Sequence, residues 1–171
     1  GMVKVAKELG PGQIYKYSRD FGFGSTTGIS FPGEAKGILR SVNQWSDRSI
    51  IGVPIGYEVG VTALQMIMAY SAIANGGYLL KPIIVDQIIS PGNNVVFESK
   101  IEVIRKIASK STMKKMKNML GQAVEYGTGR KANIEGWSVA GKTGTAYKFI
   151  DGKYSKNFIS NFIGFFPKEN P

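Results

Sequence analysis

A strand, turn and strand pattern at residues 137–166 constrains the fold more than any other feature of the sequence. Trp137, Val139 and Gly141 alternate with Ser138, Ala140 and Lys142, the period of two that is typical of a strand with one buried face. Asp151-Gly152 then supplies the positive φ angles of a tight hairpin turn. The returning run Phe158–Phe166 is apolar on both of its faces, as in a central strand covered on both sides. The pattern therefore predicts an antiparallel hairpin with a deeply buried second strand.

The first of these strands carries the residues Lys142, Thr143, Gly144 and Thr145. Lys142 offers a cation, and the two threonines offer hydroxyls. Gly144 lacks a side chain, so an extended ligand could lie against the backbone there. This combination suits an extended peptide that ends in a carboxylate, because charge-assisted hydrogen bonds favour such a group. A solvated strand end could also carry Lys-Thr-Gly by chance, so the surrounding sequence has to decide between the two.

The chain has no histidine and no cysteine. Disulfides, thiol nucleophiles and a Ser-His-Asp triad within the chain are therefore excluded. A base that activates a hydroxyl would have to be a lysine or a carboxylate. The glycines of residues 21–28 lack the spacing of a dinucleotide-binding loop, and no predicted strand precedes them. We expect no metal and no cofactor.

The formal charge of +10 permits an anionic partner such as a nucleic acid or a membrane surface. Lysines are concentrated at residues 110–117, on one side of a predicted helix and without interleaved aromatic residues. Such a face is typically solvated, and we expect no nucleic-acid partner. The longest apolar stretch, residues 61–74, is too short and too interrupted to cross a bilayer.

The rest of the chain is predicted as a series of helices and loops with one further hairpin. Residues 25–60 hold six glycines and two prolines, which indicates a loop-rich connection with a short helix near Asn43–Arg48. Gly10-Pro11-Gly12 should separate two short helices near the start, and Pro91–Asn94 should turn a peripheral hairpin. The expected helices are Met2–Leu9, Gln13–Arg19, a buried Thr62–Asn75 with a capping box, and Ser111–Tyr126.

Short motifs spread over nearly the whole chain closely resemble, in order, those of penicillin-binding proteins, and more narrowly the class B transpeptidases of the cell-division type. Lys-Thr-Gly is a signature motif of this class. The matching segments are Gly1–Ala6, Phe21–Gly24 with Thr27-Gly28, Pro32–Glu34 with Gly37–Leu39, Gly60–Thr62 with Leu64-Gln65, Ala74–Gly77, Gly127–Ala132, Gly136–Ala146, Phe162–Pro167 and Asn170-Pro171.

The resemblance implies an α+β fold of the serine β-lactamase and penicillin-binding transpeptidase type, in which helices flank an antiparallel sheet that contains the Lys-Thr-Gly hairpin. In the family, the segment similar to Gly1–Ala6 follows directly after a Ser-x-Asn motif, and the nucleophilic serine lies further upstream. A strand and a helix follow the region similar to Phe158–Pro171. Residues 1–171 are therefore expected to be the C-terminal part of a transpeptidase domain, without the nucleophile region or the last strand and helix.

Two segments imitate the missing motifs. Ser111 and Lys114 have the Ser-x-x-Lys spacing of the family's nucleophile motif, and Ser41 and Asn43 have that of Ser-x-Asn. Their order along the chain is wrong, because the Ser-x-Asn look-alike comes first. We interpret Ser111 as a serine that caps a helix N-terminus, or as the neighbour of one. No nucleophile is then expected in the chain.

The resemblance also implies a mechanism for the parent protein. A serine outside this chain would attack a peptidoglycan stem peptide, release D-alanine and pass the acyl group to an amine on a neighbouring strand; penicillins and other β-lactams would acylate the same serine. Lys142 would act catalytically near the substrate carboxylate. Thr143, Gly144 and Thr145 would bind the substrate, and the backbone N–H of Thr145 would form half of the oxyanion hole. The isolated chain is expected to be inactive.

The resemblance further places the parent protein in the bacterial inner membrane, with this domain on the periplasmic side, its anchor outside the chain and cell-division proteins as partners. Two alternatives remain open: a basic, non-enzymatic binding module of the same fold, and a serine β-lactamase relative. The doubly apolar run Phe158–Phe166 also suggests self-association through an open sheet edge.

Overall fold

The computed structural model describes residues 1–150 and 152–171, and it begins with α1 (Met2–Asp20), a helix broken in the middle. Gly10 leaves the helical conformation, with a φ of 77° and a ψ of 161°, where a residue with a side chain would be strained. The predicted break is confirmed. The second half begins at Pro11, earlier than predicted, because proline suits the first turn of a helix.

Residues 25–60 are mostly loop, as predicted. The short helix lies slightly later than expected, at Ser49, where the Ser49 hydroxyl donates to Glu58 over 2.6 Å. The elements here are β1 (Ile38–Leu39), the 3-10 helix η1 (Val42–Gln44), α2 (Ser49–Gly52), the 3-10 helix η2 (Val53–Ile55) and β2 (Val59–Gly60), and β1 pairs antiparallel with β2.

The helix α3 (Ala63–Ala74) begins at the predicted capping box. The Thr62 hydroxyl accepts from the Gln65 N–H over 3.2 Å, and the Gln65 side chain accepts from the Thr62 N–H over 3.0 Å. The buried core cluster consists of Met68, Ala72 and Leu79. The expectation that this helix is buried all round is wrong, because Ile67 is 55% exposed. An apolar composition alone does not show which neighbour covers each face.

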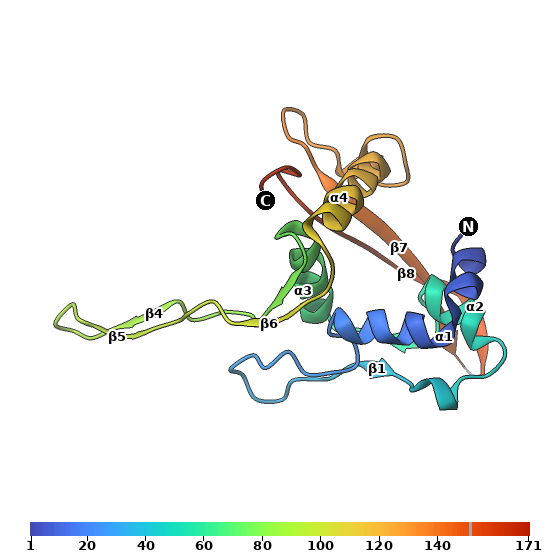
Figure 1. Cartoon of the computed structure of the whole chain (residues 1–171), viewed down its shortest axis with the longest axis horizontal. Coiled ribbons are helices and arrows are strands. Elements are labelled where there is room, and N and C mark those ends of the chain that lie inside the picture. The colour runs from blue at the N-terminus through green and yellow to red at the C-terminus, as the bar shows by residue number, and fades with distance from the viewer. Residues whose placement is uncertain (151) are drawn as a thin grey trace.

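After α3 the chain forms a long projecting arm (Figure 1). At its base β3 (Tyr78–Leu80) pairs with β6 (Val103–Lys106), and further out β4 (Gln87–Ile89) pairs with β5 (Val95–Glu98), all antiparallel. The turn between β4 and β5 uses Asn93 with a φ of 64°. The predicted peripheral hairpin is confirmed, and every residue of β4 and β5 is exposed.

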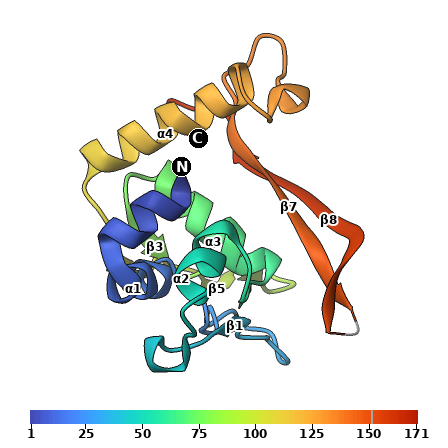
Figure 2. The ribbon, with the colours of Figure 1, turned by 90° about the vertical axis from the view of Figure 1, so that its right-hand side faces the viewer.

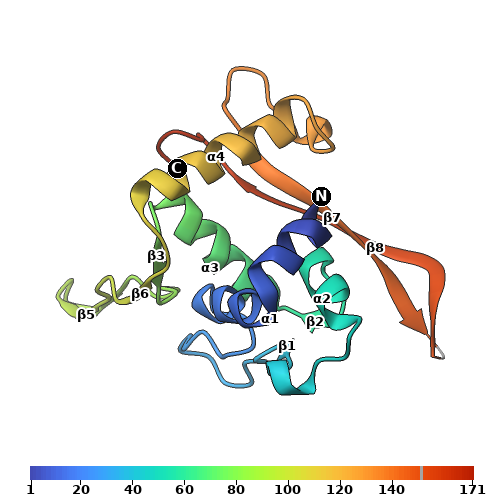
Figure 3. The same ribbon diagram turned by 45° about the vertical axis from the view of Figure 1, so that its right-hand side comes forward.

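The helix α4 (Lys110–Glu125) lies across the top of the molecule, above α3 and beside the start of the last hairpin (Figure 3). Its buried residues are Met113, Gly121 and Val124. The 3-10 helix η3 (Arg130–Ala132) follows it. Within the described residues, no helix is long and apolar enough to cross a membrane.

The last hairpin consists of β7 (Ala140–Ile150) and β8 (Lys153–Phe165), which pair antiparallel from Ala140 opposite Phe165 to Ile150 opposite Lys153. The predicted hairpin is confirmed. Of its predicted turn pair, Asp151 lies outside the described residues, and Gly152 has a φ of 77°.

The predicted deep burial of the second strand is wrong. Phe158 is 58% and Phe162 is 41% exposed. The helices α3 and α4 pack near the open end of the hairpin, and the rest of the two-stranded ribbon extends beyond them (Figure 2). The apolar run reflects a strand suited to burial, but no further layer covers it among the described residues. The open-edge association remains a prediction.

The start of the hairpin also differs from the sequence pattern. The strand begins at Ala140, and the consecutive residues Val139 and Ala140 are both buried, whereas Trp137 is 53% exposed. Trp137 instead packs edge-to-face on Phe166, with ring centroids 5.5 Å apart. The alternation predicted for residues 137–142 therefore fails, because this segment enters the core as a loop before pairing begins.

Candidate functional site

The start of β7 is anchored between α4 and β8. Gly141 lies opposite Gly164, and a Cβ atom on Gly164 would be 2.5 Å from the Ala140 carbonyl oxygen. A Cβ atom on Gly141 would be 2.7 Å from the Ile163 carbonyl oxygen. This close approach of the two strands needs glycine at both positions. The start of β7 is therefore held in a fixed position against β8, and the strand continues from there with Lys142.

Lys142 is exposed and lies at the centre of a small polar cluster. Its Nζ donates to the Thr128 hydroxyl over 3.1 Å, to the Thr143 hydroxyl over 3.2 Å and to the Thr143 carbonyl oxygen over 3.0 Å. The Thr128 and Thr143 hydroxyls are 2.8 Å apart. One cation and two hydroxyls thus meet at one point of the surface, a donor set that can bind a carboxylate.

Gly144 and Thr145 continue the strand. Gly144 lies opposite Asn161, and a Cβ atom on Gly144 would be 2.4 Å from the Asn161 side-chain oxygen. The absent side chain therefore makes room for Asn161, a reason that the sequence did not suggest. Thr145 lies opposite Ser160 and is exposed. All four predicted site residues thus lie on one strand, with Lys142 and Thr143 in direct contact.

Thr128 is the site residue that the sequence analysis missed. It belongs to the Gly127–Ala132 segment of the resemblance, which received no chemical role. The buried Gly129 holds this loop against α4: its N–H donates to the Ala123 carbonyl over 2.9 Å, and a Cβ atom there would be 3.0 Å from the same oxygen. The signal was a small, glycine-flanked threonine just after a helix.

The look-alike serines serve local structure. Ser109 caps α4, where its hydroxyl accepts from the Thr112 N–H over 3.1 Å, and the Ser111 hydroxyl is 2.9 Å from that of Ser109. Ser111 is therefore the neighbour of the capping serine. Ser41 caps η1 in a capping box. In the described part of the chain, the hydrogen bonds of the Lys142 side chain involve neither serine.

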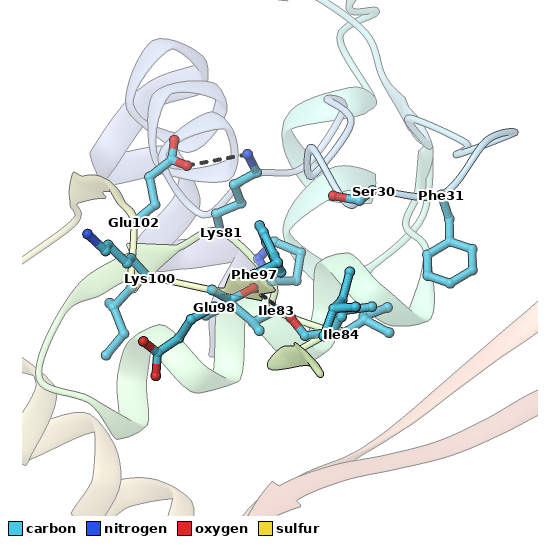
Figure 4. A pocket seen from close by; sticks show the side chains of 14 residues that line it. Ser30, Phe31, Lys81, Ile83, Ile84, Phe97, Glu98, Lys100 and Glu102 are labelled. Carbon is cyan, nitrogen blue, oxygen red and sulfur yellow. Dashed lines mark hydrogen bonds and ion pairs between the residues drawn. The ribbon is translucent and has the colours of Figure 1, made fainter. Parts of the chain in front are cut away.

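Among the described residues no group of three or more His, Cys, Asp or Glu side chains could hold a metal ion. A hollow of about 710 Å³ lies at the projecting arm (Figure 4). Neither Lys142 nor any other residue of the β7–β8 hairpin lines it.

A family model described as the penicillin-binding protein transpeptidase domain matches residues 1–171. The chain belongs to this family. The relatives below confirm the predicted class B type and the α+β transpeptidase fold.

Stage V sporulation protein D of Bacillus subtilis is 39% identical over all of the chain, which spans 27% of that relative. A probable peptidoglycan D,D-transpeptidase, PenA, of Neisseria meningitidis is 31% identical over all of the chain and 28% of its own length. The chain thus spans little more than a quarter of these curated relatives.

Two solved structures show the same fold. Penicillin-binding protein 3 of Mycobacterium tuberculosis, in complex with ampicillin, is 32% identical with a TM-score of 0.91; the match covers 99% of this chain and 39% of that one. The D,D-transpeptidase domain of a peptidoglycan glycosyltransferase from Eggerthella lenta is 27% identical with a TM-score of 0.87, over 99% of this chain and 43% of that one.

Proposed function

We propose that this transpeptidase chain supplies the substrate-carboxylate site of a peptidoglycan D,D-transpeptidase. The observation that carries the proposal is the contact of the Lys142 ammonium with the Thr128 and Thr143 hydroxyls on an exposed strand. The incoming carboxylate would accept hydrogen bonds from the ammonium and from the hydroxyls, and the ammonium would then be paired with an anion instead of with neutral hydroxyls. The relative named as a D,D-transpeptidase supports the reaction class.

In the proposed reaction a serine hydroxyl attacks the carbonyl carbon of the penultimate D-alanine of a stem peptide. The peptide bond breaks, the terminal D-alanine leaves with the proton on its amine, and an acyl-serine ester remains. An amine of a neighbouring strand then attacks the ester, forms the cross-link and frees the serine. The Thr143 and Thr145 hydroxyls would hold the terminal carboxylate, and the Thr145 N–H would stabilise the oxyanion.

The nucleophile in this proposal is not one of the serines that imitate it. Ser111 belongs to the hydroxyl cluster at the start of α4, and Ser41 to a capping box. The catalytic serine would then belong to a segment outside these residues, and the isolated chain would not turn over substrate. Residues 1–171 would be the incomplete transpeptidase domain that the sequence predicts.

The same proposal covers ligands and location. β-Lactams would acylate the catalytic serine of the whole protein, as the ampicillin complex of the Mycobacterium tuberculosis relative suggests. The whole protein would sit in the bacterial inner membrane, with this domain on the periplasmic side and division proteins as partners. One relative is named for sporulation, so the whole protein could carry out the same reaction during sporulation.

Carboxylate recognition can be tested on the chain by NMR, separately from catalysis. N-acyl-D-alanyl-D-alanine should shift the amide signals of residues 142–145, and its C-terminal amide should shift them at least about tenfold less at equal concentration, because the charge-assisted contacts are lost. Lys142→Ala should abolish the shifts, and Lys153→Ala, on the same hairpin, should not. Equal shifts with acid and amide would contradict the proposal.

A further inference from the structure

Three lysines of α4 line a second hollow, far along the chain from the projecting arm. Lys110, Lys114 and Lys117 follow one another at the i, i+4 and i+7 spacing, which places them on one face of the helix. The hollow, of about 570 Å³, lies where this face meets the end of α3 and the tail, residues 168–171 (Figure 3). Lys168 and Glu169 of the tail also line it.

The tail forms a fixed wall of this hollow. The Lys168 N–H donates to the Ser138 carbonyl over 2.7 Å and to the Ser138 hydroxyl over 3.1 Å. The Ser138 hydroxyl donates in turn to the Glu169 carboxylate, which lies 3.3 Å from the Lys168 ammonium. A Cβ atom on Gly121 would be 2.7 Å from the Lys168 Cδ atom, so the Lys168 stem lies directly on α4.

Lys117 connects the three segments around the hollow. Its half-buried side chain extends from α4, and its Nζ donates to the Ala74 carbonyl over 3.3 Å and to the Glu169 carbonyl over 3.2 Å. It therefore holds the last turn of α3 and the tail against α4. The hollow keeps its shape through contacts within the chain.

Two of the lysines have no partner. The ammonium groups of Lys110 and Lys114 make no hydrogen bond or ion pair with any described residue, and like charges at the i, i+4 spacing destabilise a helix. Glu125, the only acidic residue of α4, lies at its far end and cannot offset them. A local conflict of this kind is typical of a functional site.

The lining of the hollow is positive even after its one carboxylate is counted. Four lysines and Glu169 line it. The Ser138 hydrogen bond holds the pKa of the Glu169 carboxyl below its ordinary value of 4.5, so this group is charged at neutral pH. A surplus of three positive charges therefore remains, and it identifies the ligand as a multiply charged anion.

We propose that this hollow binds a diphosphate group. A phosphate group carries a charge of about −1.5 to −2 and three acceptor oxygens, so two linked phosphates match the positive surplus. One phosphate would accept from Lys110 and Lys114, and the other would lie towards Lys117 and Lys168. The rise of α4 separates Lys110 from Lys117 by about 10 Å along the axis, a length that the flexible lysine stems can close.

The lining favours this ligand over other anions. No aromatic side chain lines the hollow, whereas sites for single-stranded nucleic acid stack the bases on aromatic rings. A carboxylate has two oxygens in one plane, but the three oxygens of a phosphate point in different directions and can accept from α4 and from the tail at once. The hollow shares no residue with the Lys142 cluster.

The test is an amide-resolved NMR titration of the chain with sodium pyrophosphate, in buffer without divalent cations. Saturable shifts are expected at residues 110–118 and 168–170, and orthophosphate should bind at least about tenfold more weakly, because it loses the contacts of one phosphate. Shifts confined to residues 142–145 would overturn the proposal, as would shifts that grow linearly without saturation.

Uridine 5′-diphosphate distinguishes the two sources of a diphosphate group. If it binds as tightly as pyrophosphate, the site accepts a diphosphate attached to a larger molecule, such as a nucleotide or a lipid. If pyrophosphate binds and the ester does not, the ligand is free pyrophosphate. Both results support a diphosphate site, and binding of neither would overturn it.

Two neighbouring lysines provide matched variants. Lys114→Ala should weaken pyrophosphate binding at least about tenfold, since it removes one charge-assisted contact. Lys115→Ala changes the net charge equally, but Lys115 is exposed and does not line the hollow, so binding should change less than about twofold. Both side chains are exposed, and both variants should unfold at the same urea concentration as the wild type. Equal weakening by the two variants would overturn the proposal, because it would assign binding to the general charge of α4.

Discussion

Gly144 and Asn161 face each other across the β7–β8 hairpin, and a Cβ atom on Gly144 would lie 2.4 Å from the Asn161 Oδ1 atom. The glycine of the Lys-Thr-Gly motif is therefore fixed by a side chain of its own neighbouring strand. A short asparagine can relieve such a clash by turning, so the cost of a side chain here is moderate.

Gly144→Ala is expected to lower the free energy of unfolding by about 1 kcal/mol, the cost of forcing a side chain off its preferred rotamer. The double variant Gly144→Ala with Asn161→Ala should recover most of this loss, because the clashing amide is gone. Urea unfolding of the single and double variants measures both values. Additive losses in the double variant would contradict the proposed contact.

Gly164→Ala should destabilise more than Gly144→Ala and should resist rescue. The new Cβ atom would lie 2.5 Å from the Ala140 carbonyl oxygen, and backbone cannot rotate away as a side chain can. We expect a loss of about 2–3 kcal/mol, typical of overpacking. The same denaturation experiment measures it, and a loss below that of Gly144→Ala would show that the strands separate easily here.

Gln65 connects α3 to the loop-rich segment. Its buried amide donates to the Ser25 carbonyl over 2.7 Å and to the Lys36 carbonyl over 3.0 Å. Gln65→Met keeps the volume but leaves both carbonyls unpaired, so we expect a loss of about 2–4 kcal/mol. Thr62→Ala, which removes the helix cap alone, should cost about 1 kcal/mol. Equal losses in thermal unfolding would mean that the two carbonyls find other partners.

Glu34 makes part of the stability depend on pH. Desolvation raises the pKa of its carboxyl group, but hydrogen bonds from Thr27 and Gly28 outweigh it and hold the pKa below the ordinary value of 4.5. A lowered folded-state pKa stabilises the fold above pH 4.5, and this contribution is lost as the pH falls through the folded pKa. Glu34→Gln should therefore be less stable than the wild type at pH 7.

The difference in stability between the Glu34→Gln variant and the wild type should shrink as the pH falls from 4.5 through the lowered pKa of Glu34, because below that pKa both proteins carry a neutral side chain at this position. Unfolding midpoints measured in urea from pH 7 to pH 3 test this. Glu8→Gln serves as the control on the exposed face of α1. If the difference in unfolding midpoint between variant and wild type stays constant with pH, the loss of stability comes from the altered side-chain packing and not from the charge of Glu34.

The elements that the sequence predicted well are those whose ends are fixed by local chemistry. The capping box at Thr62, the break at Gly10 and the turn between β4 and β5 are properties of a few neighbouring residues. Burial was predicted less well. The apolar run of β8 is exposed because burial depends on which layers pack against the ribbon, and no local pattern carries that information.

The site shows the same division. The contact between Lys142 and Thr143 could be predicted because the two residues are neighbours in a recognisable motif, and their role in binding stays a prediction. Thr128 was not found, because its contact with Lys142 depends on how the loop after α4 folds back onto β7, which sequence spacing does not reveal. Asn161 was missed for a similar reason, since the register of β7 against β8 decides what lies beside Gly144.

Thr128→Val should weaken carboxylate binding without lowering stability. It removes one acceptor of the Lys142 ammonium and the hydroxyl partner of Thr143, but the side chain is exposed, so unfolding should change by less than about 0.5 kcal/mol. In the dipeptide titration the apparent affinity should fall at least about tenfold, the worth of one charge-assisted hydrogen bond. Thr128→Ser keeps the hydroxyl and should bind the dipeptide as tightly as the wild type. Weak binding by this variant would show that the Thr128 hydroxyl does not contribute to the site.

Ser109 and Ser111 allow the nucleophile look-alike to be tested directly. Ser109→Ala should cost about 1 kcal/mol, since it removes the cap of α4, whereas Ser111→Ala should change stability by less than about 0.5 kcal/mol. Neither the wild-type chain nor either variant should gain mass when incubated with a fluorescent penicillin and weighed intact. A single adduct that disappears in Ser111→Ala would instead make Ser111 a nucleophile, with Lys114 one helical turn away as its base, and this chain an enzyme in its own right.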